Sequence, residues 1–254
     1  MRTPIIAANW KMHKTPAEAL TFAKEFAELI RGAEGVDIVI APPYPALSEL
    51  GRALAGTGVM LAAQNVHPEP AGAFTGEVST GMLADIGCQY VIVGHSERRG
   101  LFGETNEFIA AKLRAVQDGG LRPILCVGES LGEREAGRTF EVVAAQLEGS
   151  LTRSDTARAE ELVIAYEPVW AIGTGKTATP ELAQEVHAFI RGRLEERWGG
   201  AAAQIRIQYG GSVKPESAPA LMAQTDIDGG LVGGASLDPA SFCAIIRYED
   251  RVEK

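Results

Sequence analysis

Residues 205–234 read IRIQYGGSVKPESAPALMAQTDIDGGLVGG. Two short apolar runs in this stretch, 205–209 and 230–232, are each followed at once by glycine, at Gly210-Gly211-Ser212 and at Gly233-Gly234. Barrels built from eight β-strand and α-helix units commonly bind phosphate at the turns after the seventh and eighth strands. These two runs therefore predict the last two strands of such a barrel, with an anion site at its rim.

Runs of the same kind recur along the whole chain. They are continuous rather than alternating in hydrophobicity, which is typical of parallel strands covered on both faces. Helical patterns lie between them, and two have clear start signals: Thr15-Pro16 with Glu18 as a capping-box residue, and Thr179-Pro180. The predicted strands are residues 4–8, 36–41, 59–63, 90–93, 123–127, 162–166, 205–209 and 230–232.

Periodicity cannot separate a closed barrel from an open, doubly wound sheet, but the polar residues at strand ends can. Asn9 and Lys11 follow the first predicted strand, His95 follows the fourth, and Glu167 follows the sixth. An open sheet binds ligands at one switch point, whereas a barrel takes its site from many strand ends around one rim. No linker or low-complexity tract divides the chain. We therefore expect a single (β/α)8 barrel domain over residues 1–254.

Composition narrows the classes of partner. The 254 residues are 46% hydrophobic and 22% charged, with a net charge of −9, as in a globular protein with a packed core. This charge and the lack of a basic run argue against nucleic acid, and an anionic substrate would need a local patch of positive potential. No apolar stretch reaches the roughly 18–20 residues that span a bilayer, and the first ten residues lack a signal-peptide core. We expect a cytoplasmic protein.

The sequence does not fully match several familiar motifs of functional sites. The three cysteines are far apart and form no C-x-x-C pair, so neither disulfides nor a metal site is expected. The stretch GTGKT at 173–177 resembles the end of a P-loop, but Trp170 stands where that motif needs its first glycine. The same stretch matches G-x-G-x-x-A without the strand-to-helix turn of a dinucleotide site. Arg98 replaces the second glycine of a nucleophile elbow, which argues against a serine hydrolase.

Seven ordered motifs resemble those of the triosephosphate isomerase family. They are NWKM at 9–12, GAFTGE at 72–77, VGHSERR at 93–99, CVGE at 126–129, AYEPVWAIGTG at 165–175, YGGSV at 209–213 and LVGGASL at 231–237. The resemblance implies a single-domain TIM barrel that interconverts dihydroxyacetone phosphate and glyceraldehyde 3-phosphate through a cis-enediol, in glycolysis and gluconeogenesis, without a cofactor. This family is itself a standard case of carboxylate and neutral-imidazole chemistry beneath a closing loop.

The resemblance also implies roles for particular residues. Glu167 would be the base that moves the proton between carbons, and a neutral His95 would donate to the substrate oxygens. Lys11 would attract the phosphorylated substrate and offset its developing charge. Asn9 would orient Lys11 or the substrate, with Ser96 and Glu97 in support. The phosphate would be held by backbone N–H groups of four residues, Gly173, Ser212, Gly233 and Gly234.

Two further features follow from the resemblance, and two rivals remain open. Residues 169–177 would form a closing lid, and the loop around Thr75 would insert into a second copy, which implies a homodimer with Glu77 and Arg98 as candidate ion partners across the interface. One rival is a phosphate-binding barrel with different chemistry, which should lack the combination of Lys11, His95 and Glu167. The other is a barrel that serves only as a binding or scaffolding protein.

Overall fold

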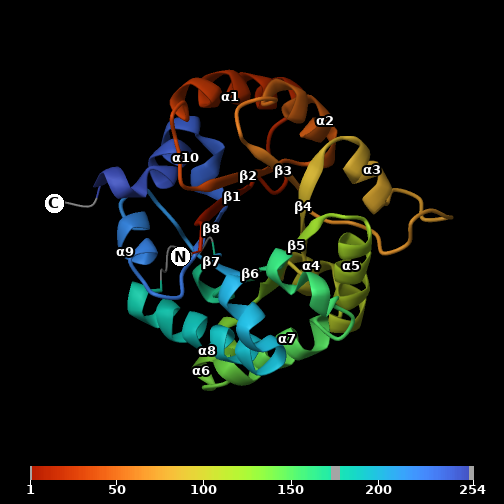
Figure 1. Cartoon of the computed structure of the whole chain (residues 1–254), viewed down its shortest axis with the longest axis vertical. Coiled ribbons are helices and arrows are strands. Elements are labelled where there is room, and N and C mark those ends of the chain that lie inside the picture. The colour runs from red at the N-terminus through yellow and green to blue at the C-terminus, as the bar shows by residue number, and fades with distance from the viewer. Residues whose placement is uncertain (1, 173–177, 252–254) are drawn as a thin grey trace.

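The computed structural model describes residues 2–172 and 178–251 as a closed parallel barrel with helices around it. Figure 1 shows the strands as a central ring and the helices as an outer one. The strands are β1 (Ile5–Asn9), β2 (Asp37–Ala41), β3 (Met60–Ala63), β4 (Cys88–Val93), β5 (Arg122–Val127), β6 (Val163–Tyr166), β7 (Arg206–Tyr209) and β8 (Gly229–Val232). All eight predicted strands are present, and the predicted barrel is confirmed. The predicted bounds differ from the observed ones by one or two residues in every strand. In β1, for example, Asn9 is the last residue and pairs with Ala41.

The ring closes where β8 pairs with β1. Ile5 lies opposite Gly229, and Ala7 lies opposite Leu231. A side chain at Gly229 would place its Cβ 1.9 Å from the carbonyl oxygen of Ile5, and the backbone there has φ 157°. Only glycine allows the two strands to approach this closely. This pairing joins the first strand to the last one and excludes an open sheet.

The helices that follow the strands begin with the signals seen in the sequence. Thr15 and Glu18 form the predicted capping box, and Thr179 accepts a hydrogen bond from the Leu182 N–H. The α-helices are α1 (Pro16–Leu29), α2 (Tyr44–Ala53), α3 (Thr80–Asp85), α4 (Ser96–Phe102), α5 (Asn106–Asp118), α6 (Leu131–Glu135), α7 (Thr139–Ser150), α8 (Pro180–Trp198), α9 (Ala218–Met222) and α10 (Pro239–Ile246). Short 3₁₀ turns are η1 (Thr156–Glu161), η2 (Val169–Ala171), η3 (Gly199–Gln204), η4 (Gly234–Leu237) and η5 (Tyr248–Arg251).

Seven of the eight strands contribute to two hydrophobic cores, whereas β7 contributes only Ile207 and Tyr209 to the core between strands and helices. In β1, Ile5 and Ala7 belong to the cluster inside the barrel, whereas Ile6 and Ala8 belong to the cluster between strands and helices. Both faces of the strands are covered along most of their length, and few strand residues, such as Gln89 and Arg122, are exposed. This explains why most of the strands are continuous apolar runs in the sequence.

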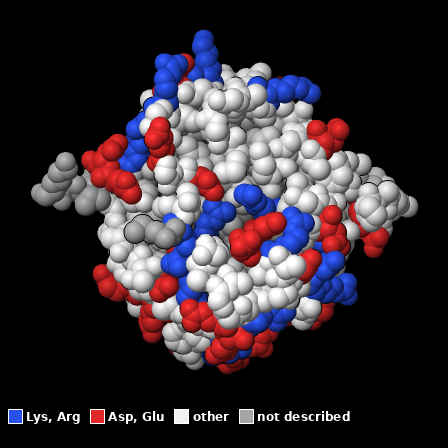
Figure 2. Space-filling model, in the orientation of Figure 1, with Lys and Arg blue, Asp and Glu red and all other residues white. Residues whose placement is uncertain are grey.

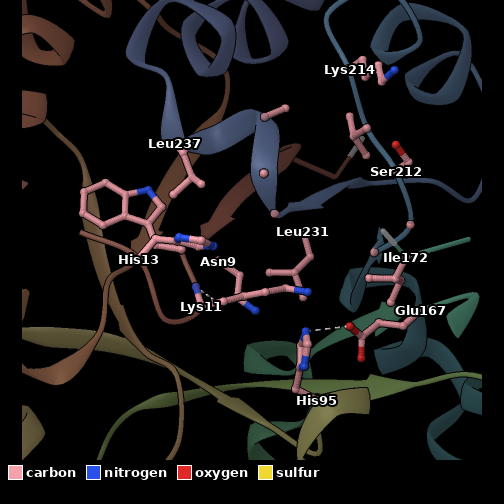
Figure 3. A pocket seen from close by; sticks show the side chains of 17 residues that line it. Asn9, Lys11, His13, His95, Glu167, Ile172, Ser212, Lys214, Leu231 and Leu237 are labelled. Carbon is pink, nitrogen blue, oxygen red and sulfur yellow. Dashed lines mark hydrogen bonds and ion pairs between the residues drawn. The ribbon is translucent and has the colours of Figure 1, made fainter. Parts of the chain in front are cut away.

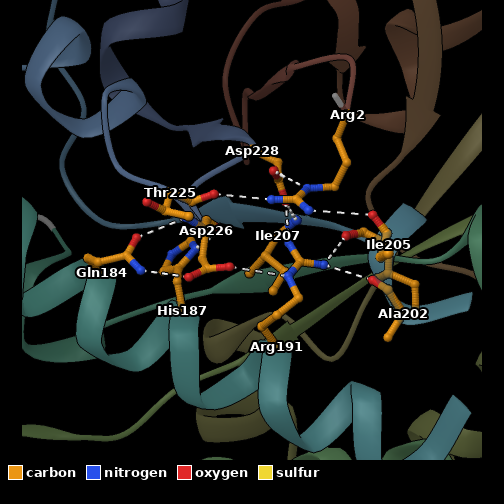
Figure 4. A network of polar contacts seen from close by, with 11 residues as sticks. Arg2, Gln184, His187, Arg191, Ala202, Ile205, Ile207, Thr225, Asp226 and Asp228 are labelled. Carbon is orange, nitrogen blue, oxygen red and sulfur yellow. Dashed lines mark hydrogen bonds and ion pairs between the residues drawn. The ribbon is translucent and has the colours of Figure 1, made fainter. Parts of the chain in front are cut away.

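Figure 4 shows a polar network that ties together segments near the amino-terminal ends of the strands. Arg191 of α8 pairs with Asp228, which precedes β8, at 2.6 Å, and donates to the carbonyl of Ala202 at 2.9 Å. Asp228 also accepts from Arg2 at 2.5 Å. Residues at this end of a barrel usually serve stability, whereas chemistry occurs at the carboxyl ends of the strands.

Candidate active site

Side chains at or just beyond the carboxyl ends of β1, β4 and β6 meet in one pocket (Figure 3). Nε2 of His95 lies 2.9 Å from Oε1 of Glu167, and the Lys11 ammonium lies 2.6 Å from Oε1 of Glu97. The cavity measures about 290 Å³, which is at the small end of ligand pockets. The structure thus brings Lys11, His95 and Glu167 together around a space that fits a small molecule. Asn9, Ser212, Gly233 and Gly234 also line it.

Glu167 is held by hydrogen bonds to β5 and from the first residue of α4. It follows β6 directly, and its backbone N–H donates to the Val127 carbonyl of β5 at 2.8 Å. Its side chain is buried, and Oε2 accepts a hydrogen bond from the Ser96 N–H at 2.9 Å. Burial alone raises the pKa of this carboxyl, but His95, the Ser96 N–H and Lys11 together hold the pKa of Glu167 below its ordinary value. The group is therefore ionised at neutral pH.

His95 is the N-cap of the short helix α4. Its Nδ1 accepts a hydrogen bond from the Glu97 N–H at 3.2 Å, which requires an unprotonated Nδ1. The ring hydrogen is then assigned to Nε2, which donates to Glu167. Burial lowers the pKa of His95, but the carboxylates of Glu167 and Glu97 outweigh burial and raise it in the unliganded pocket. The hydrogen bond to Nδ1 is available only to the neutral ring.

Lys11 has a backbone conformation that needs support. Its φ of 51° lies in the left-handed region of backbone conformation, which residues other than glycine rarely adopt. The Lys11 N–H donates to Oδ1 of Asn9 at 3.1 Å, and its carbonyl accepts from Nε2 of Gln64 at 2.9 Å. Asn9 therefore supports the backbone of Lys11. The sequence did not single out Gln64, because its contact with Lys11 spans more than fifty residues.

Glycines at two strand ends leave room for Glu167, and sequence reasoning gave them no such role. A Cβ at Gly128 would lie 1.8 Å from the Glu167 carbonyl oxygen, and one at Gly210 would lie 2.9 Å from Cγ of Glu167. At Gly211 it would lie 2.2 Å from the hydroxyl oxygen of Tyr209. Gly210 and Gly211 were interpreted as an anion-binding turn. Their close contacts show that they also allow β7 to pack against the segment that carries Glu167.

The opposite side of the pocket is suited to an anion. Ser212, Gly233 and Gly234 line it, and a Cβ at Gly233 would lie 3.7 Å from Cε of Lys11. Lys214, which the sequence analysis did not select, adds a second cation at the rim. Figure 2 shows basic side chains around the centre of this face, interleaved with a few acidic ones. The balance of positive and negative charge around the pocket therefore differs from that of the whole chain, whose net charge is −9.

Two other parts of the sequence bear on this region. His13, which had no predicted role in the site, lines the pocket at an exposed position. Gly173 and the rest of 173–177 lie outside the described residues, so most of the predicted lid and one of the predicted phosphate ligands do too. In the part of the lid that is described, the Trp170 indole donates to Oε1 of the fully buried Glu129 at 2.8 Å, and Arg134 stacks on the Trp170 ring at 4.5 Å.

Two kinds of feature are absent from the described residues. Between residues 2 and 251, with 173–177 left aside, no three His, Cys, Asp or Glu side chains are arranged to hold a metal ion. Over the same residues, no helix combines the length and hydrophobicity that a membrane span requires.

A carboxylate, an imidazole and an ammonium that face one small cavity at a barrel rim define an enzyme that moves protons on a small anionic substrate. Comparison with known proteins identifies the family. A sequence model described as Triosephosphate isomerase matches residues 4–249, and the chain belongs to the triosephosphate isomerase family.

Individual relatives are similar to this chain along almost their whole length. The triosephosphate isomerase of Carboxydothermus hydrogenoformans is 56% identical over 97% of this chain and 99% of that protein. The Symbiobacterium thermophilum triosephosphate isomerase is 57% identical over 96% of both. The crystal structure of triosephosphate isomerase from Bartonella henselae superposes with a TM-score of 0.89 at 39% identity, covering 98% of this chain and 99% of that one.

Proposed function

We propose that this chain interconverts dihydroxyacetone phosphate and D-glyceraldehyde 3-phosphate, with Glu167, His95 and Lys11 as its catalytic residues. Membership of the triosephosphate isomerase family supports the reaction. The observation that carries the assignment of residues is that these three side chains line one cavity together with Ser212, Gly233 and Gly234. Such an enzyme is an aldose–ketose isomerase.

The reaction needs one base and one hydrogen-bond donor of the protein, which act on neighbouring atoms of the substrate. The Glu167 carboxylate removes a proton from C1 of dihydroxyacetone phosphate, and the electron pair moves onto the C2 oxygen to form an enediolate. The same carboxylate returns a proton to C2, while the hydroxyl proton on O1 moves to O2. Atoms and charge balance without any external acceptor.

His95 stabilises the enediolate through its Nε2–H. In the unliganded pocket this hydrogen points at Glu167, whose charge raises the pKa of His95. A substrate oxygen in place of that carboxylate would remove the main cause of the increase. Burial and the hydrogen bond from the Glu97 N–H would remain, and both favour a neutral ring. The bound ring is then a donor that keeps its proton.

Lys11 supplies the positive charge that the mechanism requires at the substrate oxygen. Its ammonium is held by Glu97, and its backbone is held by Asn9 and Gln64, so the charge is fixed before the substrate binds. A preorganised charge stabilises the transition state without the cost of reorganisation. The phosphate would rest against the N–H groups of Ser212, Gly233 and Gly234, and, as proposed from the family resemblance, of Gly173.

The experiment is isomerisation in D₂O followed by proton NMR, with no added metal or nucleotide. Dihydroxyacetone phosphate should yield glyceraldehyde 3-phosphate, with deuterium incorporated at carbon. Glu167→Gln preserves the shape of the side chain but removes the base. It should lose at least about 10³-fold in rate while still binding inorganic phosphate. A wild-type protein without activity would contradict the function, and a fully active Glu167→Gln would contradict the role of Glu167.

We also propose that the whole chain, 1–254, is one domain that forms a cytoplasmic homodimer through the loop around Thr75. This loop joins β3 to α3 and projects from the barrel in Figure 1. It is shaped by its own contacts, since the rings of His67 and Phe74 lie 4.0 Å apart, yet Phe74 remains 42% exposed. Exposed Met12 and Phe102 add apolar surface that a second copy would cover. Sedimentation equilibrium should give twice 26.9 kDa.

A further inference from the structure

Arg99 is a partly buried cation that the proposed mechanism does not use. It belongs to the VGHSERR motif at 93–99, next to the residues assigned to catalysis. Its guanidinium donates to two backbone carbonyls, of Gly94 at 2.8 Å and of Cys126 at 3.1 Å. It also donates to Oδ1 of Asn106 at 2.6 Å and to Oγ of Ser150 at 3.3 Å. One side chain therefore joins the ends of β4 and β5 to α5 and α7.

The two backbone partners lie beside the segments that carry His95 and Glu167, the hydrogen-bond donor and the base of the proposed mechanism. The Gly94 carbonyl belongs to the peptide that connects Gly94 to His95. Cys126 lies on β5, opposite Ala165 of β6, the strand that Glu167 follows. Arg99 thus fastens the turn that carries His95 to the strand pair that carries Glu167.

Local geometry makes this link specific to arginine. Gly94 has φ 69°, and a Cβ there would lie 3.0 Å from Nη2 of Arg99, so the turn and the guanidinium fit closely. The planar fork points its N–H groups at several fixed partners at once, which a lysine ammonium on a flexible stem cannot do. Asn106 and Ser150 hold the outer edge of the fork from outside the pocket.

We propose that Arg99 is a positioning residue that sets the geometry of the His95 and Glu167 pair. This inference rests on the proposed function, because it assumes that both side chains act on the substrate. Near-attack geometry is sensitive to displacement, and an error of about 1 Å can cost on the order of 10²-fold in rate. Among the described residues, the guanidinium of Arg99 donates to Gly94, Asn106, Cys126 and Ser150, and not to Ser212, Gly233 or Gly234. Its loss should therefore affect turnover and leave anion binding intact.

The test compares Arg99→Lys with Arg191→Lys as a matched control. Arg191 likewise makes several hydrogen bonds to backbone and side chains, but it lies near the amino-terminal ends of the strands (Figure 4). For each protein we would measure kcat, KM, inhibition by inorganic phosphate and the unfolding temperature. Arg99→Lys should lower kcat about 10- to 100-fold, with KM and phosphate inhibition within about twofold of wild type. Arg191→Lys should lower the unfolding temperature and leave kcat within about twofold.

Other outcomes overturn the proposal. They are an unchanged kcat in Arg99→Lys, an equal loss of kcat in both variants, or a parallel loss of phosphate inhibition in Arg99→Lys. If Arg99→Lys does not fold, Asn106→Ala removes the closest partner of the guanidinium. That variant should lower kcat at least about threefold with phosphate inhibition preserved, and an unchanged kcat refutes the role of Arg99. An inactive wild type in the same assay would instead refute the proposed function.

Discussion

Replacing Gly128 by alanine should displace the base without altering any group that reacts. In the structure, the new Cβ would lie 1.8 Å from the Glu167 carbonyl oxygen and 2.6 Å from its carbonyl carbon. Ordinary van der Waals contact begins near 3.4 Å, so the two backbones must separate by about 1.5 Å. Gln146 holds Gly128 from the other side. Its side-chain oxygen accepts a hydrogen bond from the Gly128 N–H at 2.7 Å, and its side-chain nitrogen donates one to the Gly128 carbonyl at 3.0 Å. Most of the displacement should therefore fall on Glu167.

A shift of this size predicts the magnitude of the effect. Movement of the carboxylate by about 1 Å or more should lower kcat on the order of 10²-fold. The overpacked contact should also lower the free energy of unfolding by about 1–3 kcal/mol. The anion site on the other side of the pocket is untouched, so inhibition by inorganic phosphate should persist.

The assay measures kcat, phosphate inhibition and urea unfolding for Gly128→Ala and for a control, Gly132→Ala. Gly132 lies in α6, and a Cβ there meets nothing within 4 Å. The control should keep wild-type kcat and gain up to about 1 kcal/mol of stability from its better helix propensity. A folded Gly128→Ala with kcat within about threefold of wild type would refute the argument that this glycine determines where Glu167 lies.

Three further predictions concern the base, a buried histidine and the exposed loop. Glu167→Asp retracts the carboxylate by about 1 Å and should cost on the order of 10²-fold in turnover with phosphate binding retained; a variant with normal turnover contradicts the role. Burial lowers the pKa of His187 from 6.5 to about 4, so the unfolded chain takes up a proton that the native state excludes, and stability falls as the pH drops from 6.5 to 4. Over this range wild type should lose about 3 kcal/mol more than His187→Gln in urea titrations, and equal losses would contradict it. Phe74→Asp should shift sedimentation at micromolar concentration from dimer toward monomer, and an unchanged mass would place the interface elsewhere.

Most of the helices and strands could be predicted from the sequence, because the interactions that form them are local. The Thr15 and Glu18 capping box acts within one helical turn, and the β-strands read as apolar runs because both of their faces are covered. The candidate site residues were predicted from motifs at strand ends, where a parallel barrel brings its polar residues to one rim. Boundaries were less certain, as Asn9 shows, since a strand ends where its pairing ends and not where its hydrophobicity does.

Contacts between distant parts of the chain could not be predicted from the sequence. Gln64 supports the Lys11 backbone, Arg99 links β4 to β5, and Gly128 lies against Glu167, yet in each case the partner is far away along the chain. Residue type gave no signal, because a glutamine, an arginine or a glycine has many structural uses. His13 shows the reverse limit, since a lone histidine carried no motif and still lines the pocket.

The sequence by itself determined which segments form strands and helices, and which motifs carry an ammonium, an imidazole and a carboxylate, because hydrophobic pattern and residue chemistry are properties of the chain. Only the tertiary structure decided that β8 closes onto β1 and that His95 and Glu167 stand 2.9 Å apart. Distances of this kind are set by packing and backbone approach between segments remote in sequence, and no local pattern encodes them.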